Sequence, residues 1–569
     1  MALFALTLCF AHAMAQQGPG ATLTRLADLY VAKMFEFSPE SATFFGAAGG
    51  NDGALSDNSA AGVLKWQHFE DSLLTALNTL NPAQLSTGDR ITYGILHEQL
   101  AGDADCEVCK TELWSVDQVG GWQINFTELA TIQPVGTNAK RNAALSRWSK
   151  IPQYIRNEIS KLKIGLSRNY SAPKTNVSLV ITQIEGMITD KPEKSPFYAP
   201  ALADTDKVFD AAINRLIADS IAPALKQYRE YLQTQYLPAA RTVISIAALP
   251  NGAVCYRAML HASTTLSISP EGIYDEGVQA IADREAKTKA LGLTLYGTND
   301  LDKINQRLNN DTSNNFKTRD EITAYSTAAI ARAQARLPLY FHMLPKATVA
   351  IKAIPVYEEQ SGYPHYEPAP DDGSRPGTYY IDLYAPEKQN KGDAEVTAFH
   401  ETYPGHHLQM SIARELMKSS PVSKYIFNSG YVEGWARYCE TLADEMGLYS
   451  SDLNRLKLYS QTPTGMVVDP GIHFKGWTRE QAIAYTLVHQ PSFNQQQAES
   501  YVDRIAIEPA QMTSYGVGEL QFKTLRRLAE TQLGTKFKLK AFHDQCLNQG
   551  TVPLDMLSSH INDWINKEK

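Results

Sequence analysis

Apolar side chains recur at three- and four-residue spacing along most of the chain, which is the pattern of amphipathic helices that pack on a core. In the first half this pattern predicts helices over 23–37, 60–80, 86–100, 150–164, 206–236 and 269–291. In the second half it predicts helices over 395–418, 431–446, 478–487, 494–507 and 515–533. We therefore expect a mainly α-helical protein.

One segment departs from the helical pattern and is typical of a β-strand. Residues 378–384 are rich in aromatic and β-branched side chains. They follow a stretch, 355–376, that is rich in Pro, Gly and Tyr and has no periodicity. That stretch is either a lid over a site or an ordinary surface connection, and the sequence leaves both readings open.

Length and charge limit the class of protein. With 569 residues and 43% hydrophobic content the chain can bury a large core, and chains longer than about 250–300 residues usually divide into more than one core. We expect residues 16–569 to form a single domain of two helical lobes. A net charge of −8 without any Lys/Arg-rich run argues against nucleic acid as a partner. No stretch after the first residues reaches the ~18–20 apolar residues of a membrane span, and the oligomeric state is not indicated.

The first residues are typical of a secretion signal. An apolar run over 3–10 precedes Ala13-Met14-Ala15, a small-x-small cleavage pattern, and then Gln16. We interpret 1–15 as a signal peptide and expect a periplasmic or secreted protein. The basic residues that usually open such a peptide are missing, so a late start or a buried apolar N-terminus stays open.

The cysteines are too few for a disulfide scaffold. Apart from Cys9 there are five, and only Cys106 and Cys109 lie close together in sequence. In an oxidising compartment this pair could close a small loop disulfide, or both could remain idle thiols.

The strongest chemical signal is the segment 400–407, His-Glu-Thr-Tyr-Pro-Gly-His-His, which holds three of the thirteen histidines. Zinc prefers neutral imidazoles and carboxylates in tetrahedral arrangement, and a hydrolytic site keeps one position open for water. Glu401, next to the first histidine, is placed to take a proton from water that zinc activates. A buried histidine cluster without metal is the structural alternative.

The spacing of the histidines requires a break in the helix. Position i+4 from His400 is Pro404, while His407 at i+7 lies about 10 Å away along an ideal helix. Pro404 has no backbone donor and Gly405 tolerates unusual dihedral angles, so we expect the chain to break between Glu401 and His406. We favour His406 as the second ligand, with His407 as the alternative. The other histidine would then donate a hydrogen bond to substrate.

Glu433 is the best candidate for the third ligand. It opens the predicted helix over 431–446, and Arg437 and Glu440 share its face at i+4 and i+7. There they would hold the ligands in orientation. Taken alone, Glu433 would be an ordinary carboxylate at a helix start, and the upstream histidines change that interpretation.

Two residues farther along are candidates for catalysis. The hydroxyl of Tyr515 could stabilise the oxyanion that forms when water adds to a carbonyl, and Arg504 could grip a peptide carboxylate. The structural alternatives are a packed tyrosine and a surface ion pair.

The chain resembles the bacterial DUF885 group, whose signature His-Glu-x-x-Pro-Gly-His-His-Leu-Gln is present at 400–409. The resemblance extends to 432–436, to 509–516 and to 249–252. It implies kinship with helical zinc peptidases such as angiotensin-converting enzyme and the thermostable carboxypeptidases, with two helical lobes around a deep channel and a small β element at the cleft. By the same analogy, 378–384 would be an edge strand that pairs with extended substrate.

We therefore expect an exported zinc peptidase that binds Zn²⁺ through His400, His406 and Glu433. Glu401, Tyr515, Arg504 and His407 are its expected catalytic residues, and peptides its substrates. Two alternatives stay open: a noncatalytic protein that binds zinc or peptides, and a zinc hydrolase that acts on an ester or another amide.

Overall fold

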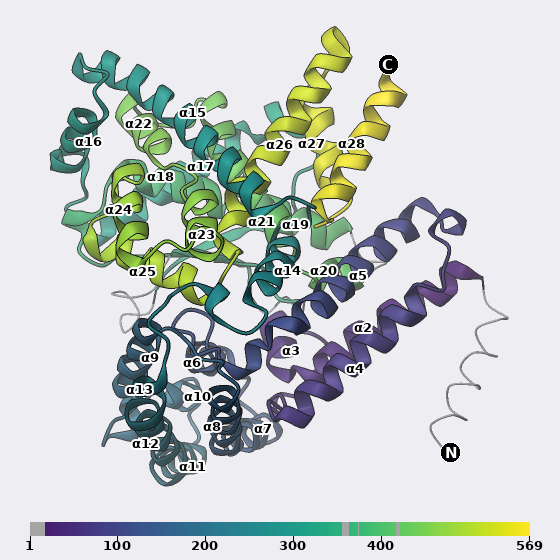
Figure 1. The fold of residues 1–569 in the computed structure, drawn as a ribbon, viewed down its shortest axis with the longest axis vertical. Helices are drawn as coiled ribbons and strands as arrows, with labels where there is room; N and C mark the ends of the chain where they lie inside the picture. Colours follow the sequence, from purple (N-terminus) through teal and green to yellow (C-terminus); the bar gives the residue numbers. More distant parts are fainter. Residues whose placement is uncertain (1–17, 355–363, 372, 374, 417–420) are drawn as a thin grey trace.

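The computed structural model describes residues 18–354, 364–371, 373, 375–416 and 421–569 (Figure 1). The proposed signal peptide, 1–15, and part of the stretch 355–376 lie outside these residues. The described chain is mainly helical with one small sheet, as the periodicity predicts.

The N-terminal helices run along one side of the molecule and then lead into a separate helical group. In Figure 1 the long helices α2, α4 and α5 form an arm on the right, and α6 to α13 gather at the bottom. The predicted helix over 206–236 is continuous, because π-helical turns at 217–221 and 232–236 join α11 to α12 and α12 to α13. The bounds are α2 (Pro19–Phe37), α3 (Pro39–Phe45), α4 (Ala60–Leu77), α5 (Thr87–Cys106), α6 (Trp122–Ile132), α7 (Asn138–Trp148), α8 (Ile151–Ser167), α9 (Lys174–Met187), α10 (Ala199–Leu202), α11 (Lys207–Leu216), α12 (Ala222–Tyr231) and α13 (Leu237–Ala239).

The rest of the chain forms the upper part of the molecule as it is drawn in Figure 1. It includes the signature segment and the small sheet. The bounds are α14 (Gly252–Thr264), α15 (Pro270–Tyr296), α16 (Leu301–Asn310), α17 (Arg319–Tyr340), β1 (Val349–Ala353), β2 (His365–Glu367), β3 (Gly377–Ile381), α18 (Lys391–Glu401), α19 (His406–Leu416), α20 (Pro421–Tyr425), α21 (Ser429–Glu445), α22 (Asp452–Ser460), α23 (Gly465–His473), α24 (Arg479–His489), α25 (Gln495–Ile507), α26 (Gln511–Leu533), α27 (Leu539–Leu547) and α28 (Leu554–Glu568).

Two large hydrophobic cores underlie this arrangement. One joins the N-terminal arm to α17–α21 and α26–α28, and the other fills the group from α6 to α14. Met466, Ile507, Ala510 and Val517 belong to the second core although they lie late in the chain. The segments from α23 to α26 therefore connect the two cores.

The sheet has the order β1-β3-β2, with β1 parallel and β2 antiparallel to β3. The expectation of an edge strand over 378–384 is wrong, since β3 is the central strand and ends at Ile381. Both of its edges are already paired, so it offers no free edge to an extended substrate. The two partner strands are short, and β2 lies inside the stretch that has no periodicity.

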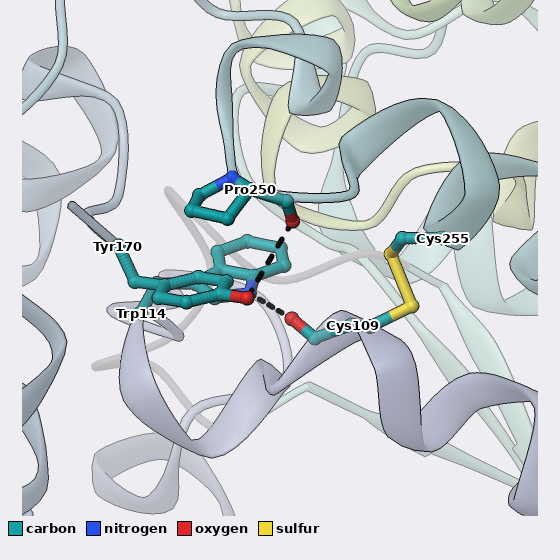
Figure 2. Close-up of a disulfide and its surroundings, with 5 residues drawn as sticks. All are labelled: Cys109, Trp114, Tyr170, Pro250 and Cys255. Atoms are coloured by element: carbon teal, nitrogen blue, oxygen red, sulfur yellow. Dashed lines mark hydrogen bonds between the residues drawn. A yellow bond between two sulfur atoms is a disulfide. The ribbon is translucent and has the colours of Figure 1, made fainter. Parts of the chain in front are cut away.

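The disulfide joins Cys109 to Cys255, 146 residues apart, and leaves Cys106 free (Figure 2). Neither alternative for Cys106 and Cys109 is correct, because they are not bridged to each other and only Cys106 is a free thiol. Both bonded cysteines are buried, one in the turn after α5 and the other on α14. Trp114 Nε1 donates a hydrogen bond of 3.0 Å to the carbonyl oxygen of Cys109.

None of the helices in the described ranges is long and apolar enough to cross a membrane.

Candidate metal centre

The chain reverses between α18 and α19, where Pro404 and Gly405 predict a break. α18 ends at Glu401, the Tyr403–Pro404 peptide bond is cis, and α19 begins at His406. The amide of Gly405 donates to the carbonyl oxygen of Phe399 at 3.1 Å. A Cβ at Gly405 would lie only 1.9 Å from the carbonyl oxygen of His400, so this close approach requires glycine.

The reversal brings the second histidine edge to face against the first. The rings of His400 and His406 lie 4.6 Å apart at 86°. Trp435 Nε1 donates a hydrogen bond of 3.0 Å to the carbonyl oxygen of Pro404 and fixes the turn against α21. The break therefore does what an uninterrupted helix cannot, because it returns a later histidine to the side of His400.

His400, His406 and Glu433 form a group of three possible metal ligands whose donor atoms all lie within 4.8 Å of one another. Oε2 of Glu433 is 3.5 Å from Nε2 of His400 and 3.5 Å from Nε2 of His406. This oxygen is buried and has no hydrogen-bond partner in the described part of the chain.

These three residues fit a zinc ion. Four-coordinate zinc with bonds of about 2.0–2.2 Å separates neighbouring ligand atoms by about 3.4 Å, close to the two observed distances. Two imidazoles and a carboxylate are a ligand set of hydrolytic zinc sites, and they leave the fourth position open. An otherwise orphaned buried carboxylate oxygen between two ring nitrogens is what such a site needs.

Glu440 orients the first histidine. Oε1 of Glu440 lies 2.9 Å from Nδ1 of His400, and Glu440 is almost fully buried. Nδ1 therefore carries the proton that Glu440 accepts, and the lone pair of Nε2 points toward Glu433. Arg437 Nη1 in turn lies 2.8 Å from Oε2 of Glu440 and keeps that carboxylate in place.

Negatively charged carboxylates surround the imidazoles of this three-residue group. Burial alone would lower the pKa of His400, but the carboxylates of Glu433 and Glu440 reverse this effect and raise the pKa to about 10. Burial alone would likewise raise the pKa of Glu433, whereas the two imidazoles hold it well below its usual range. The electrostatic surroundings thus favour positive charge among these donors.

Glu401 lies beside this group with its carboxylate uncommitted. It is buried, and burial raises its pKa while the charges of His400 and His406 act in the opposite direction. No hydrogen bond engages its carboxylate among the residues that the structure describes. It can therefore exchange a proton with a water molecule at the group.

The expected contact of His407 with substrate is not available in this structure. His407 is fully buried and turns toward the sheet, where Tyr366 on β2 donates to Nδ1 at 2.8 Å. Nε2 donates to the carbonyl oxygen of Ala347 at 3.2 Å. Burial lowers the pKa of His407 to about 4, so the ring is neutral. Both nitrogens are occupied, and His407 joins α19 to the sheet.

Tyr515 reaches the site because α21 and α26 touch through their backbones. A Cβ at Gly434 would lie 2.4 Å from Cα of Gly518, so neither helix could approach as closely with a side chain there. This contact places Tyr515, three residues before Gly518, near Glu433, whose charge adds to burial in raising the pKa of the phenol.

Arg504 lies near Tyr515 but is already paired. Its Nε is 2.9 Å from Oε2 of Glu508, and its Nη2 donates to Gln511 at 3.3 Å. Its side chain keeps 29% of its surface exposed. Tyr515 lines the same cavity as His400, whereas Arg504 does not line it and is committed to Glu508 and Gln511.

A cavity of about 830 Å³ opens onto the site, lined among others by His400, Tyr515 and Tyr379 of β3. Sequence reasoning did not single out Tyr366, which lies in the stretch without periodicity, and it included Tyr379 only as part of the predicted strand over 378–384. The stripe Asp393, Thr397 and His400 on α18 also lines this cavity. Its i, i+4, i+7 spacing was a readable signal that the sequence interpretation did not use.

Comparison with known proteins gives a family and a fold. A family model described as "Bacterial protein of unknown function (DUF885)" matches residues 39–561. No curated protein matches the chain.

Two solved structures share the fold over nearly their whole length. A putative lipoprotein from Colwellia psychrerythraea has 23% identity and a TM-score of 0.86, with 96% of this chain and 99% of that one covered. A putative lipoprotein of unknown function from Shewanella oneidensis has 20% identity and a TM-score of 0.75, with 94% and 99% covered.

Proposed function

The chain belongs to the bacterial DUF885 family, and we propose that it is a zinc-dependent peptidase whose metal ligands are His400, His406 and Glu433. One observation carries the proposal. The buried Oε2 of Glu433 has no hydrogen-bond partner and lies 3.5 Å from Nε2 of each histidine, with the free carboxylate of Glu401 next to them.

The chemistry is hydrolysis of a peptide bond. A zinc ion held by these three residues would supply Lewis-acid chemistry and would lower the pKa of the attacking water. Glu401 accepts a proton from that water as its oxygen bonds to the carbonyl carbon, and returns the proton to the amine as the C–N bond breaks. Burial raises the pKa of Glu401, which suits a group that must both accept and donate a proton.

Three other residues support this reaction. Tyr515 lines the cavity with His400, and its hydroxyl donates to the oxyanion that forms on the carbonyl oxygen. Arg504 holds a positive charge beside the tyrosine while it stays paired with Glu508. Glu440 keeps His400 in the ligating tautomer.

We also propose that the protein works outside the cytoplasm. The Cys109–Cys255 disulfide is buried and intact, and such bridges form and persist in oxidising compartments. The two similar structures are described as putative lipoproteins, a class that functions at the cell envelope. Both observations support the interpretation of 1–15 as a secretion signal.

The test is zinc reconstitution followed by a substrate panel of peptides, esters and non-peptide amides. Zinc-dependent cleavage of peptides supports the proposal. Zinc binding without turnover indicates a binding protein, and turnover of esters alone indicates a different hydrolase.

A further inference from the structure

The cavity beside the metal centre is lined by further polar side chains of α18, the helix that carries His400. Asp393, Thr397 and His400 all line the cavity and form one stripe on α18. Seven residues of helix at 1.5 Å each separate Asp393 from His400 by about 10 Å. An extended peptide advances about 3.3 Å per residue, so this distance spans about three residues of substrate.

Lys457 of α22 and Gln461, the residue that follows α22, face the Asp393 end of this stripe. Nζ of Lys457 lies 3.3 Å from Oδ2 of Asp393, and Nε2 of Gln461 donates to Oδ1 of Asp393 at 3.1 Å. Only 6% of the Lys457 side chain is exposed, whereas Asp393 keeps 38%. Both Lys457 and Gln461 line the same cavity as His400.

The ammonium of Lys457 has unused donors. It carries three N–H groups, yet among the described residues its one polar partner is Asp393, at a distance longer than the ~2.7–2.9 Å of a strong charge-assisted hydrogen bond. The Lys457 side chain is largely buried but lines the cavity, so its remaining N–H groups can be met only by acceptors that enter the cavity. A ligand that brings acceptor oxygens into the cavity would supply them.

The carboxylate of Asp393 has more polar partners than the ammonium of Lys457. It has two partners, Lys457 and Gln461, and it lies in the first turn of α18, where the helix dipole stabilises negative charge. A second anion beside Lys457 could therefore accept hydrogen bonds from the ammonium N–H groups that Asp393 does not engage. These contacts favour a carboxylate as the ligand over an ammonium group.

We propose that Lys457 and Gln461 bind the terminal carboxylate of a peptide substrate, so that cleavage releases a di- or tripeptide from the C-terminal end. This inference rests on the proposed peptidase function and specifies its substrate. The terminal carboxylate lies at the Asp393 end of the stripe, and the bond to be broken lies at His400. Thr397, between them, faces the released part of the peptide.

The first experiment compares cleavage of N-acetyl-tetraalanine with cleavage of its C-terminal amide by the zinc-loaded protein. The free acid is expected to have a kcat/KM about 10- to 100-fold higher, the effect of one hydrogen-bonded charge. Lys457→Met removes this preference, and Lys457→Arg restores much of it. Lys388→Met is the matched control, since Lys388 is an exposed lysine that lines the same cavity, and it keeps the preference.

A binding measurement separates failure of the subsite from failure of the proposed function. The zinc-loaded Glu401→Gln variant is titrated calorimetrically with both peptides, with and without Lys457→Met, after thermal melting shows that the variants fold. Selective binding of the free acid, lost in Lys457→Met, supports the subsite even if the wild-type protein cleaves no peptide.

The subsite is overturned by equal affinity for the acid and the amide, by binding of neither peptide, or by an acid preference that survives Lys457→Met. A strict requirement for a free amino terminus also overturns it, because Asp393 would then be the group that binds the substrate.

Discussion

Nδ1 of His400 lies 2.9 Å from Oε1 of Glu440, on the side of the ring that faces away from Glu433. This hydrogen bond fixes the tautomer in which Nε2 is free to bind a metal. Arg437 holds the other oxygen of Glu440 at 2.8 Å.

Glu440→Gln is expected to weaken zinc binding by about 10- to 100-fold, the usual cost of losing such a partner. Competition with a zinc chelator measures the affinity. Glu445→Gln is the matched control, because Glu445 lies on the same helix but pairs with Arg526 at the surface. An unchanged affinity in Glu440→Gln would show that the contact does not support the site.

Glu401→Gln is expected to leave zinc binding intact and to lower kcat by at least about 100-fold, because the amide cannot accept the proton of the attacking water. Zinc content and peptide hydrolysis are measured on the same preparation. Full activity in a variant that holds its zinc would remove Glu401 from the mechanism.

Cys255→Ser is expected to lower the free energy of unfolding by about 2–5 kcal/mol, since the Cys109–Cys255 bridge closes a long loop of the chain. Thermal unfolding without reductant measures the loss. Cys106→Ser is the control and should behave as the wild type, because Cys106 is free. The reverse result, a stable Cys255→Ser and an unstable Cys106→Ser, would indicate the Cys106–Cys109 pairing instead.

The stability of the folded protein is expected to depend on pH through Asp469. Asp469 is fully buried, accepts hydrogen bonds from the hydroxyl of Tyr256 and the amide of Ala510, and burial raises its pKa to about 7. The unfolded chain has an ordinary value near 3.9. The folded state therefore binds the extra proton, and the resulting stability is complete below about pH 4 and lost as the pH rises through about 7.

Between pH 5 and pH 8 the wild type should thus lose about 2–3 kcal/mol relative to Asp469→Asn. Thermal melting at both values measures the difference. Asp206→Asn is the control, because backbone hydrogen bonds lower the pKa of Asp206 and it stays ionised at both values. A stability difference between wild type and Asp469→Asn that does not change with pH would show that Asp469 does not titrate in this range.

Local sequence rules predicted the parts of the molecule that depend on neighbouring residues. The helices follow the apolar period, and the break at Pro404 and Gly405 follows from a missing donor and a missing side chain. The alternative between His406 and His407 could not be resolved in this way. It depends on Trp435, which fixes the carbonyl of Pro404, and on Tyr366, which engages His407.

Pairings between segments far apart in the sequence could not be predicted either, because they depend on tertiary contacts. The partner of Cys109 is 146 residues away, and nothing near Cys106 indicates that it stays free. The strand over 377–381 became central through β1 and β2, whose own patterns are too short to identify. The approach of α26 to α21 depends on Gly434 and Gly518 meeting face to face, a pairing that neither segment shows alone.

Zinc-dependent peptidase activity is tested by the metal content of the purified protein together with hydrolysis of a mixed peptide library before and after chelation. We expect about one zinc per chain, as a single catalytic site requires, with cleavage that chelation abolishes and zinc restores. We expect neither zinc nor cleavage in Glu433→Ala, which lacks the shared carboxylate. Protein that holds no zinc after reconstitution, or that cleaves peptides equally well without metal, would contradict the proposed function.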